Sequence, residues 1–80
     1  MYSGPYIYLR WEHRDNFRYY EVYLQRDLFS QWCLTRIWGR KTTPLGQMKH
    51  TPYDNYEKAL RSIDIIMKQR NQRGYHLQNV

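Results

Sequence analysis

The first half of the chain alternates apolar or aromatic side chains with polar ones, and this pattern constrains the fold more than any other feature. The alternation runs through residues 6–14, returns in residues 17–26 and recurs in residues 31–38. A period of two places successive side chains on opposite faces of a β-strand, and aromatic and β-branched residues favour such a surface. Short turn-forming segments separate the three runs. The pattern therefore predicts an antiparallel sheet.

The second half predicts a short fourth strand over residues 47–52 and then one long helix. Asp54 is expected as the N-cap, with Glu57 three residues later completing a capping box. The helix is expected to run to about Gln72, and Gly74 offers a stop. One apolar stripe keeps helical spacing: Tyr56, Ala59, Leu60, Ile63, Ile66 and Met67. A one-sided helix needs a sheet to cover, so we expect an α+β fold: an antiparallel sheet of about four strands with one long C-terminal helix packed across it.

Eighty residues are enough for one small domain, which we expect over residues 6–77, preceded by a flexible leader at 1–5 and followed by a tail at 78–80. Nine Tyr, three Trp and two Phe predict a core built from aromatic rings, with Trp11 and Trp32 inside it.

The chain shows no secretory signal and no apolar run of the roughly 18 residues that span a bilayer. A single cysteine, Cys33, excludes an intramolecular disulfide framework and is expected as a small core residue. Both observations favour a reduced, cytoplasmic location. His13, His50 and His76 lack metal-ligand spacing, and no catalytic constellation is visible. We therefore expect no enzyme activity, cofactor, metal or small-molecule substrate, and no membrane association.

The net charge of +6 and a pI near 9.7 favour polyanionic partners, with nucleic acid first and an anionic membrane surface second. The alternative interpretation is that the charge only keeps a small domain in solution. The helix ends in a basic cluster of Lys68, Arg70 and Arg73. Cations complement the dipole at a helix C-terminus, so we expect this cluster to be solvated surface outside any binding site.

The end of the third strand carries Trp38, Gly39 and Arg40 in succession. An indole can cover a sugar or base, glycine permits close backbone approach, and a guanidinium can contact two phosphate oxygens at once. The alternatives are a core indole, a glycine that ends the strand, and a surface charge. If the fourth strand pairs beside the third, further basic residues lie around this motif. The candidate nucleic-acid-binding set is Arg36, Trp38, Gly39, Arg40, Lys41 and Lys49.

Four separate pieces of the chain, in order, resemble the WGR domain, a small module found in DNA-damage-dependent poly(ADP-ribose) polymerases and in bacterial proteins. The resemblance runs from about Leu9 to Tyr75 and is closest to stand-alone bacterial members. The segment 41–45 departs from the family pattern, because it is longer than the matching segment of the shorter bacterial form and lacks that segment's early glycine. The pieces are Arg18-Tyr19-Tyr20-Glu21-Val22; Asp27-Leu28-Phe29 with Trp32; Arg36-Ile37-Trp38-Gly39-Arg40; and Gly46-Gln47, the helix with Ala59, and Arg73-Gly74-Tyr75.

In the polymerases this domain contacts DNA at a strand break and bridges to neighbouring domains. The resemblance implies that Trp38 packs on a sugar near a DNA end, that Arg40 contacts the backbone or a partner domain, and that Lys49 touches DNA. The resulting hypothesis is a cytoplasmic module, nucleoid-associated if it binds DNA, that contacts the sugar-phosphate backbone with little sequence specificity, at ends or nicks. RNA is a second candidate partner. The alternative is a protein-interaction adaptor that uses the same edge.

Overall fold

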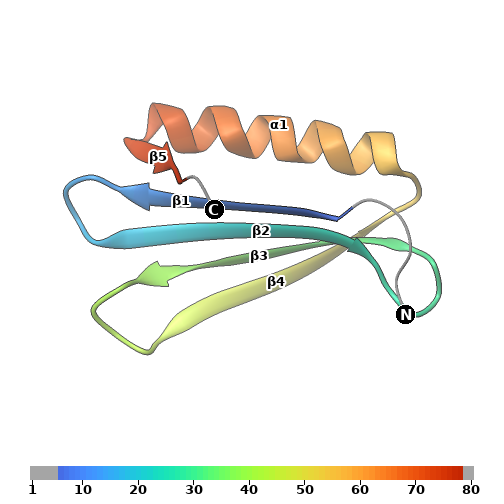
Figure 1. Cartoon of the computed structure of the whole chain (residues 1–80), viewed down its shortest axis with the longest axis horizontal. Coiled ribbons are helices and arrows are strands. Elements are labelled where there is room, and N and C mark those ends of the chain that lie inside the picture. Colours follow the sequence, from blue (N-terminus) through green and yellow to red (C-terminus); the bar gives the residue numbers. More distant parts are fainter. Residues whose placement is uncertain (1–5, 79–80) are drawn as a thin grey trace.

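The structure, a computed structural model, describes residues 6–78; the predicted leader at 1–5 and residues 79–80 of the predicted tail lie outside the described residues. Five strands form one antiparallel sheet in the order β4-β3-β2-β1-β5, and a single helix lies along one side of it (Figure 1). The elements are β1 Ile7–His13, β2 Arg18–Arg26, β3 Trp32–Arg40, β4 Gly46–Tyr53, α1 Tyr56–Gln72 and β5 Tyr75–Leu77. The predicted α+β class is confirmed.

The strand count is larger than expected, because the chain adds a fifth strand after the helix. Strand β5 pairs antiparallel with β1, on the side opposite β2, with Trp11 opposite Leu77 and His13 opposite Tyr75. The amide of Gln78 continues this pairing by donating to the carbonyl oxygen of Arg10 at 2.7 Å. The last residues of the domain are therefore attached to the sheet, next to the end of the helix.

The core lies between the helix and one face of the sheet. Alternate residues of the strands supply it, as the period of two requires. Trp11 and Trp32 are buried, as predicted. Cys33 is not a core residue: it pairs with Gln25 and Pro52 and is half-buried on the sheet face that the helix leaves open. The buried apolar residues are Trp11, Tyr20, Val22, Leu24, Trp32, Leu34, Ala59, Ile63 and Ile66.

The helix begins one residue later than predicted, because Asn55 and not Asp54 is the N-cap. The backbone of Asn55 is extended, and its side-chain oxygen accepts a hydrogen bond from the amide of Lys58 at 2.9 Å. Both residue types can cap a helix, so the choice depends on which of them adopts the extended conformation. Asp54 instead forms an ion pair with the Lys58 side chain at 3.4 Å.

The helix ends at Gln72, as expected, and Gly74 follows with a φ of 87°. Glycine adopts this left-handed conformation without the penalty that a side chain imposes. The buried stripe is narrower than predicted, since Leu60 and Met67 are 36% and 37% exposed. It continues instead through Ile66 to a charged residue, Arg70, which is buried.

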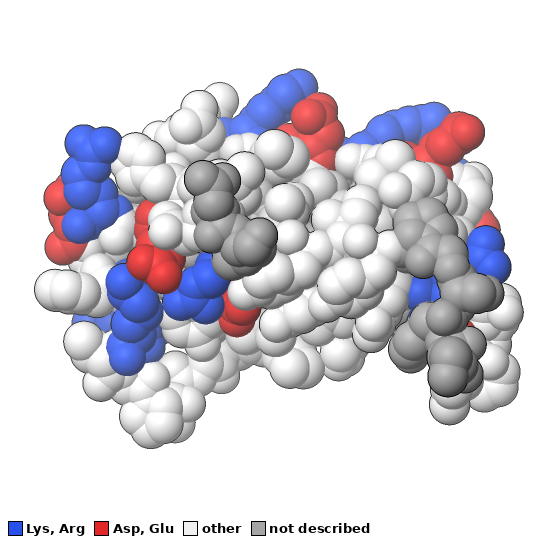
Figure 2. Space-filling model, in the orientation of Figure 1, with Lys and Arg blue, Asp and Glu red and all other residues white. Residues whose placement is uncertain are grey.

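The antiparallel order gives the molecule two distinct ends. The β1–β2 turn, the β3–β4 turn, β5 and the C-terminal end of α1 lie together at one end (left in Figure 1). The β2–β3 turn and the N-terminal end of α1 lie at the other. On the face shown in Figure 2, Lys or Arg and Asp or Glu are intermixed at the left end and along the helix, around an uncharged centre. No helix in the described part of the chain is long and apolar enough to cross a membrane.

Candidate functional site

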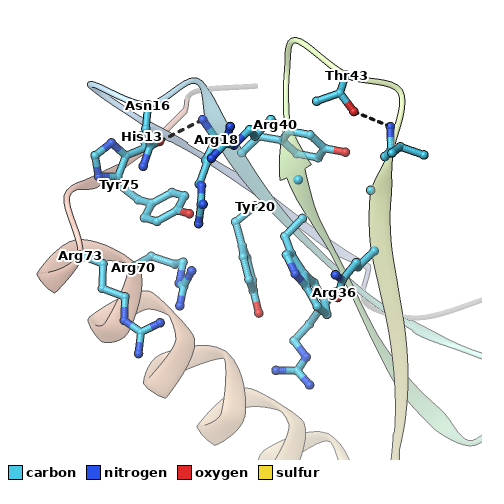
Figure 3. Close-up of a pocket in the computed structure, with 16 residues that line it drawn as sticks. His13, Asn16, Arg18, Tyr20, Arg36, Arg40, Thr43, Arg70, Arg73 and Tyr75 are labelled. Carbon is cyan, nitrogen blue, oxygen red and sulfur yellow. Dashed lines mark hydrogen bonds between the residues drawn. The ribbon is translucent and has the colours of Figure 1, made fainter.

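A cavity of about 830 Å³ lies at the end of the molecule where the helix finishes. It is lined by residues from every strand and from α1 (Figure 3). None of its sixteen lining residues, all within the described part of the chain, is acidic. Within residues 6–78, no carboxylate lies within ion-pair distance of the five arginines that line it. We call it the arginine cavity, after Arg18, Arg36, Arg40, Arg70 and Arg73.

The positions of the five arginines follow from the sheet register and the helical repeat. Arg18 and Arg40 are register partners at the start of β2 and the end of β3. Arg36 lies four residues before Arg40 in β3, so the period of two puts both on the helix-facing side. Arg70 and Arg73 are three residues apart in the last turn and at the C-cap of α1, and therefore share a face. Figure 3 shows Tyr20 between Arg70 and Arg36.

A column of stacked side chains forms the inner wall of the cavity. The indole of Trp38 stacks on the ring of Tyr20, with centroids 5.9 Å apart and an interplanar angle of 17°. On its other side, Tyr20 meets the guanidinium of Arg70, whose Cζ lies 4.4 Å from the ring centroid. The same guanidinium lies 5.0 Å from the ring centroid of Tyr75. Arg70 therefore lies against both tyrosine rings.

Trp38 lies between the exposed position that the resemblance implies for a DNA contact and the core position that was the alternative. It is half-buried and packs against the edge of the core through Tyr20, yet it also lines the cavity. An indole fixed in this way can present a flat apolar surface to a sugar or base without rearranging. One face of the indole is held by its stacking on Tyr20.

Arg70 and Arg73 both line the cavity, although the sequence predicted them as solvated surface outside any binding site. Arg70 departs furthest from that prediction. It is only 9% exposed, and its Nε atom has no hydrogen-bond partner among the described residues. Buried polar groups nearly always have a hydrogen-bond partner, so this nitrogen is an exception, and the guanidinium is held instead by its contacts with the rings of Tyr20 and Tyr75. A signal was present in the sequence: Arg70 follows Ile66 by four residues and so extends the buried stripe.

Gly39 has a structural explanation in this geometry. A Cβ at that position would lie 3.1 Å from the carbonyl oxygen of Leu45 and 3.2 Å from the Cα of Gly46. The two glycines face each other across β3 and β4, and the hydroxyl of Tyr19 lies close to both. The missing side chain therefore allows close packing of the hairpin beside the cavity.

The two lysines of the predicted set do not line the cavity. Lys41 forms an ion pair with Glu12 at 2.8 Å. This contact, together with Arg10, lowers the pKa of the Glu12 carboxyl. Glu12 belongs to the opposite sheet face, because it alternates with the buried Trp11. Lys49 is exposed. It lies opposite Arg36 in the β3–β4 register, three residues farther from the β3–β4 turn than Gly46. Arg36, Trp38, Gly39 and Arg40 are the predicted residues that the fold brings together.

Local hydrogen bonds, each between residues two apart, stabilise the β1–β2 and β3–β4 turns at the cavity entrance. The side-chain oxygen of Asn16 accepts from the amide of Arg18 at 3.1 Å. Thr43 accepts from the amide of Leu45 at 2.8 Å. The ring of His13 packs edge-on against Tyr75 with centroids 5.1 Å apart.

Among the described residues, no three His, Cys, Asp or Glu side chains are grouped so that they could hold a metal ion.

Comparison with known proteins identifies the family of the chain. The family model of the WGR domain matches residues 6–79. The chain is 37% identical over 62 residues to y4dW, an uncharacterised protein of Sinorhizobium fredii; the match covers 78% of the chain and 30% of y4dW. The chain thus spans less than a third of that relative. No solved structure matches. The chain belongs to the WGR domain family, whose members are generally nucleic-acid-binding modules in poly(ADP-ribose) polymerase-like proteins.

Proposed function

We propose that the protein binds DNA by placing backbone phosphates in the arginine cavity. The observation that carries the proposal is a cavity lined by five arginines and no acidic residue, all in the described part of the chain. Guanidinium groups bind phosphate oxygens in pairs, and cations that lack carboxylate partners attract a polyanion most strongly. The half-buried Trp38 supplies an apolar surface for the neighbouring sugar or base.

The size of the cavity favours a strand end over a continuous duplex. Its volume of about 830 Å³ is that of a small-molecule pocket. Such a space receives a terminal nucleotide or a short single-stranded stretch, whereas an intact duplex would contact only its outer residues. We therefore propose a preference for ends, nicks or frayed strands.

Binding of this kind depends little on sequence. The inner face of α1 packs on the sheet through Ala59, Ile63 and Ile66, so the helix is not free to enter a groove with that face. Contacts to phosphate and sugar position a protein without reading bases. We expect affinities of the order of micromolar at physiological salt, falling steeply as salt rises.

The test is a fluorescence-anisotropy titration with blunt, nicked and single-stranded DNA of one sequence, at two salt concentrations. Arg36→Gln, Arg40→Gln and Arg73→Gln each remove one cavity charge and should each weaken binding roughly three- to tenfold and lower the salt slope by about one. Arg61→Gln, on an exposed part of α1, is the matched control and should change affinity less than twofold. Unchanged affinity in all three cavity variants would defeat the proposal.

Two further arms separate the alternatives. A matched RNA that binds as tightly as the DNA would extend the partner class, because stacking and phosphate contacts do not require a deoxyribose. A protein retained after nuclease treatment, and lost on Arg40→Gln, would favour the adaptor role for this edge. The unpaired arginines support nucleic acid as the first choice. We propose binding without catalysis. We expect the protein to lie in the cytoplasm on the nucleoid, and imaging of a tagged chain tests this location.

A further inference from the structure

Two exposed apolar side chains lie at the rim of the arginine cavity, one on each turn at that end of the molecule. Phe17, in the β1–β2 turn, is 61% exposed, and Leu45, in the β3–β4 turn, is 81% exposed. Leu45 lines the cavity, and Phe17 lies between Asn16 and Arg18, which both line it. The amide of Lys41 donates to the carbonyl oxygen of Phe17 at 2.7 Å and so connects the two turns. We call Phe17 and Leu45 the rim pair.

Neither packing nor backbone preference explains a phenylalanine at position 17. Phe17 adopts a left-handed φ of 58°, a conformation that glycine and asparagine take more readily than bulky residues. Its ring is not part of the hydrophobic core. Residues held in such conformations concentrate at binding sites, where the surrounding structure fixes them. An exposed phenylalanine with a strained backbone is therefore best explained by a contact outside the chain.

The backbone around each member of the rim pair is fixed. The side-chain oxygen of Asn16 accepts from the amide of Arg18, which closes a loop around Phe17. The side-chain oxygen of Thr43 accepts from the amide of Leu45 itself. Both hydrogen bonds are drawn in Figure 3. A preorganised surface loses less conformational entropy when it binds, so the rim pair is ready to make a contact.

The geometry of a duplex end determines what this contact is, and the reasoning rests on the proposed function. If a terminal nucleotide enters the arginine cavity, its base must leave the opposite base and the base pair below. That base pair then exposes one flat, uncharged face to water. Aromatic and aliphatic side chains cover such faces, and stacking on them tolerates every base. The rim pair supplies an apolar surface of this kind beside the cavity.

We propose that the rim pair opens the end of a DNA duplex by one base pair and covers the face of the next pair, while the released nucleotide enters the arginine cavity. Phe17 stacks on that face. Leu45, which also lines the cavity, lies where the two strands separate. Phenylalanine and leucine are both used as wedges between base steps by proteins that deform DNA. The protein therefore holds an opened end of the duplex.

The charges of the two turns favour a base pair over an anionic lipid surface. The β1–β2 turn carries one cation and one acid, Arg14 and Asp15, and Lys41 in the β3–β4 turn is paired with Glu12 at 2.8 Å. The five arginines line the cavity that these turns border. A lipid surface is negative over its whole area and attracts cations around the inserted residues. The face of a base pair is uncharged and its phosphates lie at the periphery, which matches apolar turns beside a basic cavity.

The first experiment compares DNA molecules of one sequence by anisotropy: a hairpin with one open end, a closed dumbbell without ends, and the single strand. Phe17→Asn with Leu45→Ser should weaken binding to the open-ended hairpin about tenfold, because the stacking on a base pair is lost. Affinity for the dumbbell and the single strand should change less than about twofold, because neither offers the face of a terminal base pair. Phe17→Trp keeps an aromatic ring and should bind the hairpin like the parent.

The controls separate this contact from folding and from general stickiness. Asparagine adopts a left-handed conformation readily, so the double variant should unfold in urea at no lower concentration than the parent. Leu28→Ser with Phe29→Ser changes an exposed apolar pair in the β2–β3 turn, at the opposite end of the molecule. This matched control should leave all three affinities unchanged.

The second experiment observes the opening itself. 2-Aminopurine, an adenine analogue whose fluorescence increases when it is unstacked, is placed at the terminal position of each strand in turn. Fluorescence should rise for at least one strand when the parent saturates the hairpin, and should not rise with the double variant at saturation. The analogue placed in the middle of the duplex should not respond to either protein.

The two proposals fail by different results. Equal losses on hairpin and single strand, an unchanged hairpin affinity in the double variant, or no rise in fluorescence would each overturn the opening of the end. Parent binding to phosphatidylserine–phosphatidylcholine vesicles that the double variant loses, with unchanged hairpin affinity, would assign the rim pair to a membrane instead. The arginine cavity fails separately, if Arg36→Gln, Arg40→Gln and Arg73→Gln all bind the single strand as tightly as the parent.

Discussion

Replacing Arg70 with methionine separates a binding role from a structural one, because the structure predicts opposite results for the two properties. The guanidinium lies against Tyr20 and Tyr75 at 4.4 and 5.0 Å. Losing these two cation–π contacts removes about 1–4 kcal/mol. Methionine restores the packing and returns about 0.3–1.5 kcal/mol for each sulfur–aromatic contact. Removing a buried, unpartnered charged donor regains about 1–3 kcal/mol.

These contributions nearly cancel, so Arg70→Met should change the free energy of unfolding by less than about 1 kcal/mol. Arg70→Ala should instead lower it by about 2–5 kcal/mol, because a void opens between the two tyrosine rings. Binding behaves differently. A charged hydrogen bond to phosphate is worth about 1.5–3 kcal/mol, so Arg70→Met should weaken DNA binding roughly ten- to hundredfold.

Urea denaturation gives the first quantity, and an anisotropy titration at several salt concentrations gives the second. Lys68→Met is the matched control: Lys68 is exposed on the same helix and pairs with Asp64 at 3.1 Å. It should alter DNA affinity less than threefold. If Arg70→Met unfolds far more easily than the parent, or binds DNA as tightly as the parent, the argument that this guanidinium is kept for an anion is wrong.

Three further predictions follow from the strands around the cavity. Gly39→Ala should lower the free energy of unfolding by about 1–3 kcal/mol in urea denaturation, because its Cβ meets the carbonyl oxygen of Leu45 at 3.1 Å; parent-like stability would contradict the close packing. Burial, then the hydrogen bond donated to Glu21, raise the pKa of Tyr8 from 10.0 to about 12. The folded state thus favours the protonated phenol, and its stabilisation is full below pH 10 and lost between pH 10 and 12. Tyr8→Phe should therefore lose less stability over that window than the parent, and equal losses would argue against the shift. Lys49→Gln should weaken DNA binding less than Arg36→Gln in the same titration, because only the arginine lines the cavity; the reverse order would move the interface to β4.

Most of the sheet could be predicted because β1, β2 and much of β3 alternate apolar with polar side chains, which a single sequence displays directly. Strand β5 could not, since three residues are too few to show a period and its pairing with β1 depends on contacts far along the chain. The N-cap lies one residue after the predicted one, because Asp54 and Asn55 have similar capping chemistry and the sequence alone does not distinguish them. Local chemistry thus predicts an element better than it predicts its boundary.

The candidate site was only partly visible for a related reason. Arg36 and Arg40 lie beside Trp38 in one strand, so their proximity follows from the sequence. Arg18 and Arg70 reach the same cavity from segments that only the folded topology brings there. Lys41 shows the converse: it is adjacent to Arg40 in the chain but is held by Glu12 on the other face. Neighbours in the chain are not neighbours in the site.

Because the walls of the arginine cavity come from five strands and the helix, no fragment of the chain can reproduce it. An anion that fits there recognises the native state alone, and its binding energy is added to the folding equilibrium. At a free concentration one hundred times its dissociation constant, such a compound raises the unfolding free energy by about 2.7 kcal/mol. Thermal melting in the presence of short oligonucleotides or mononucleotides is therefore a label-free way to rank what this module holds.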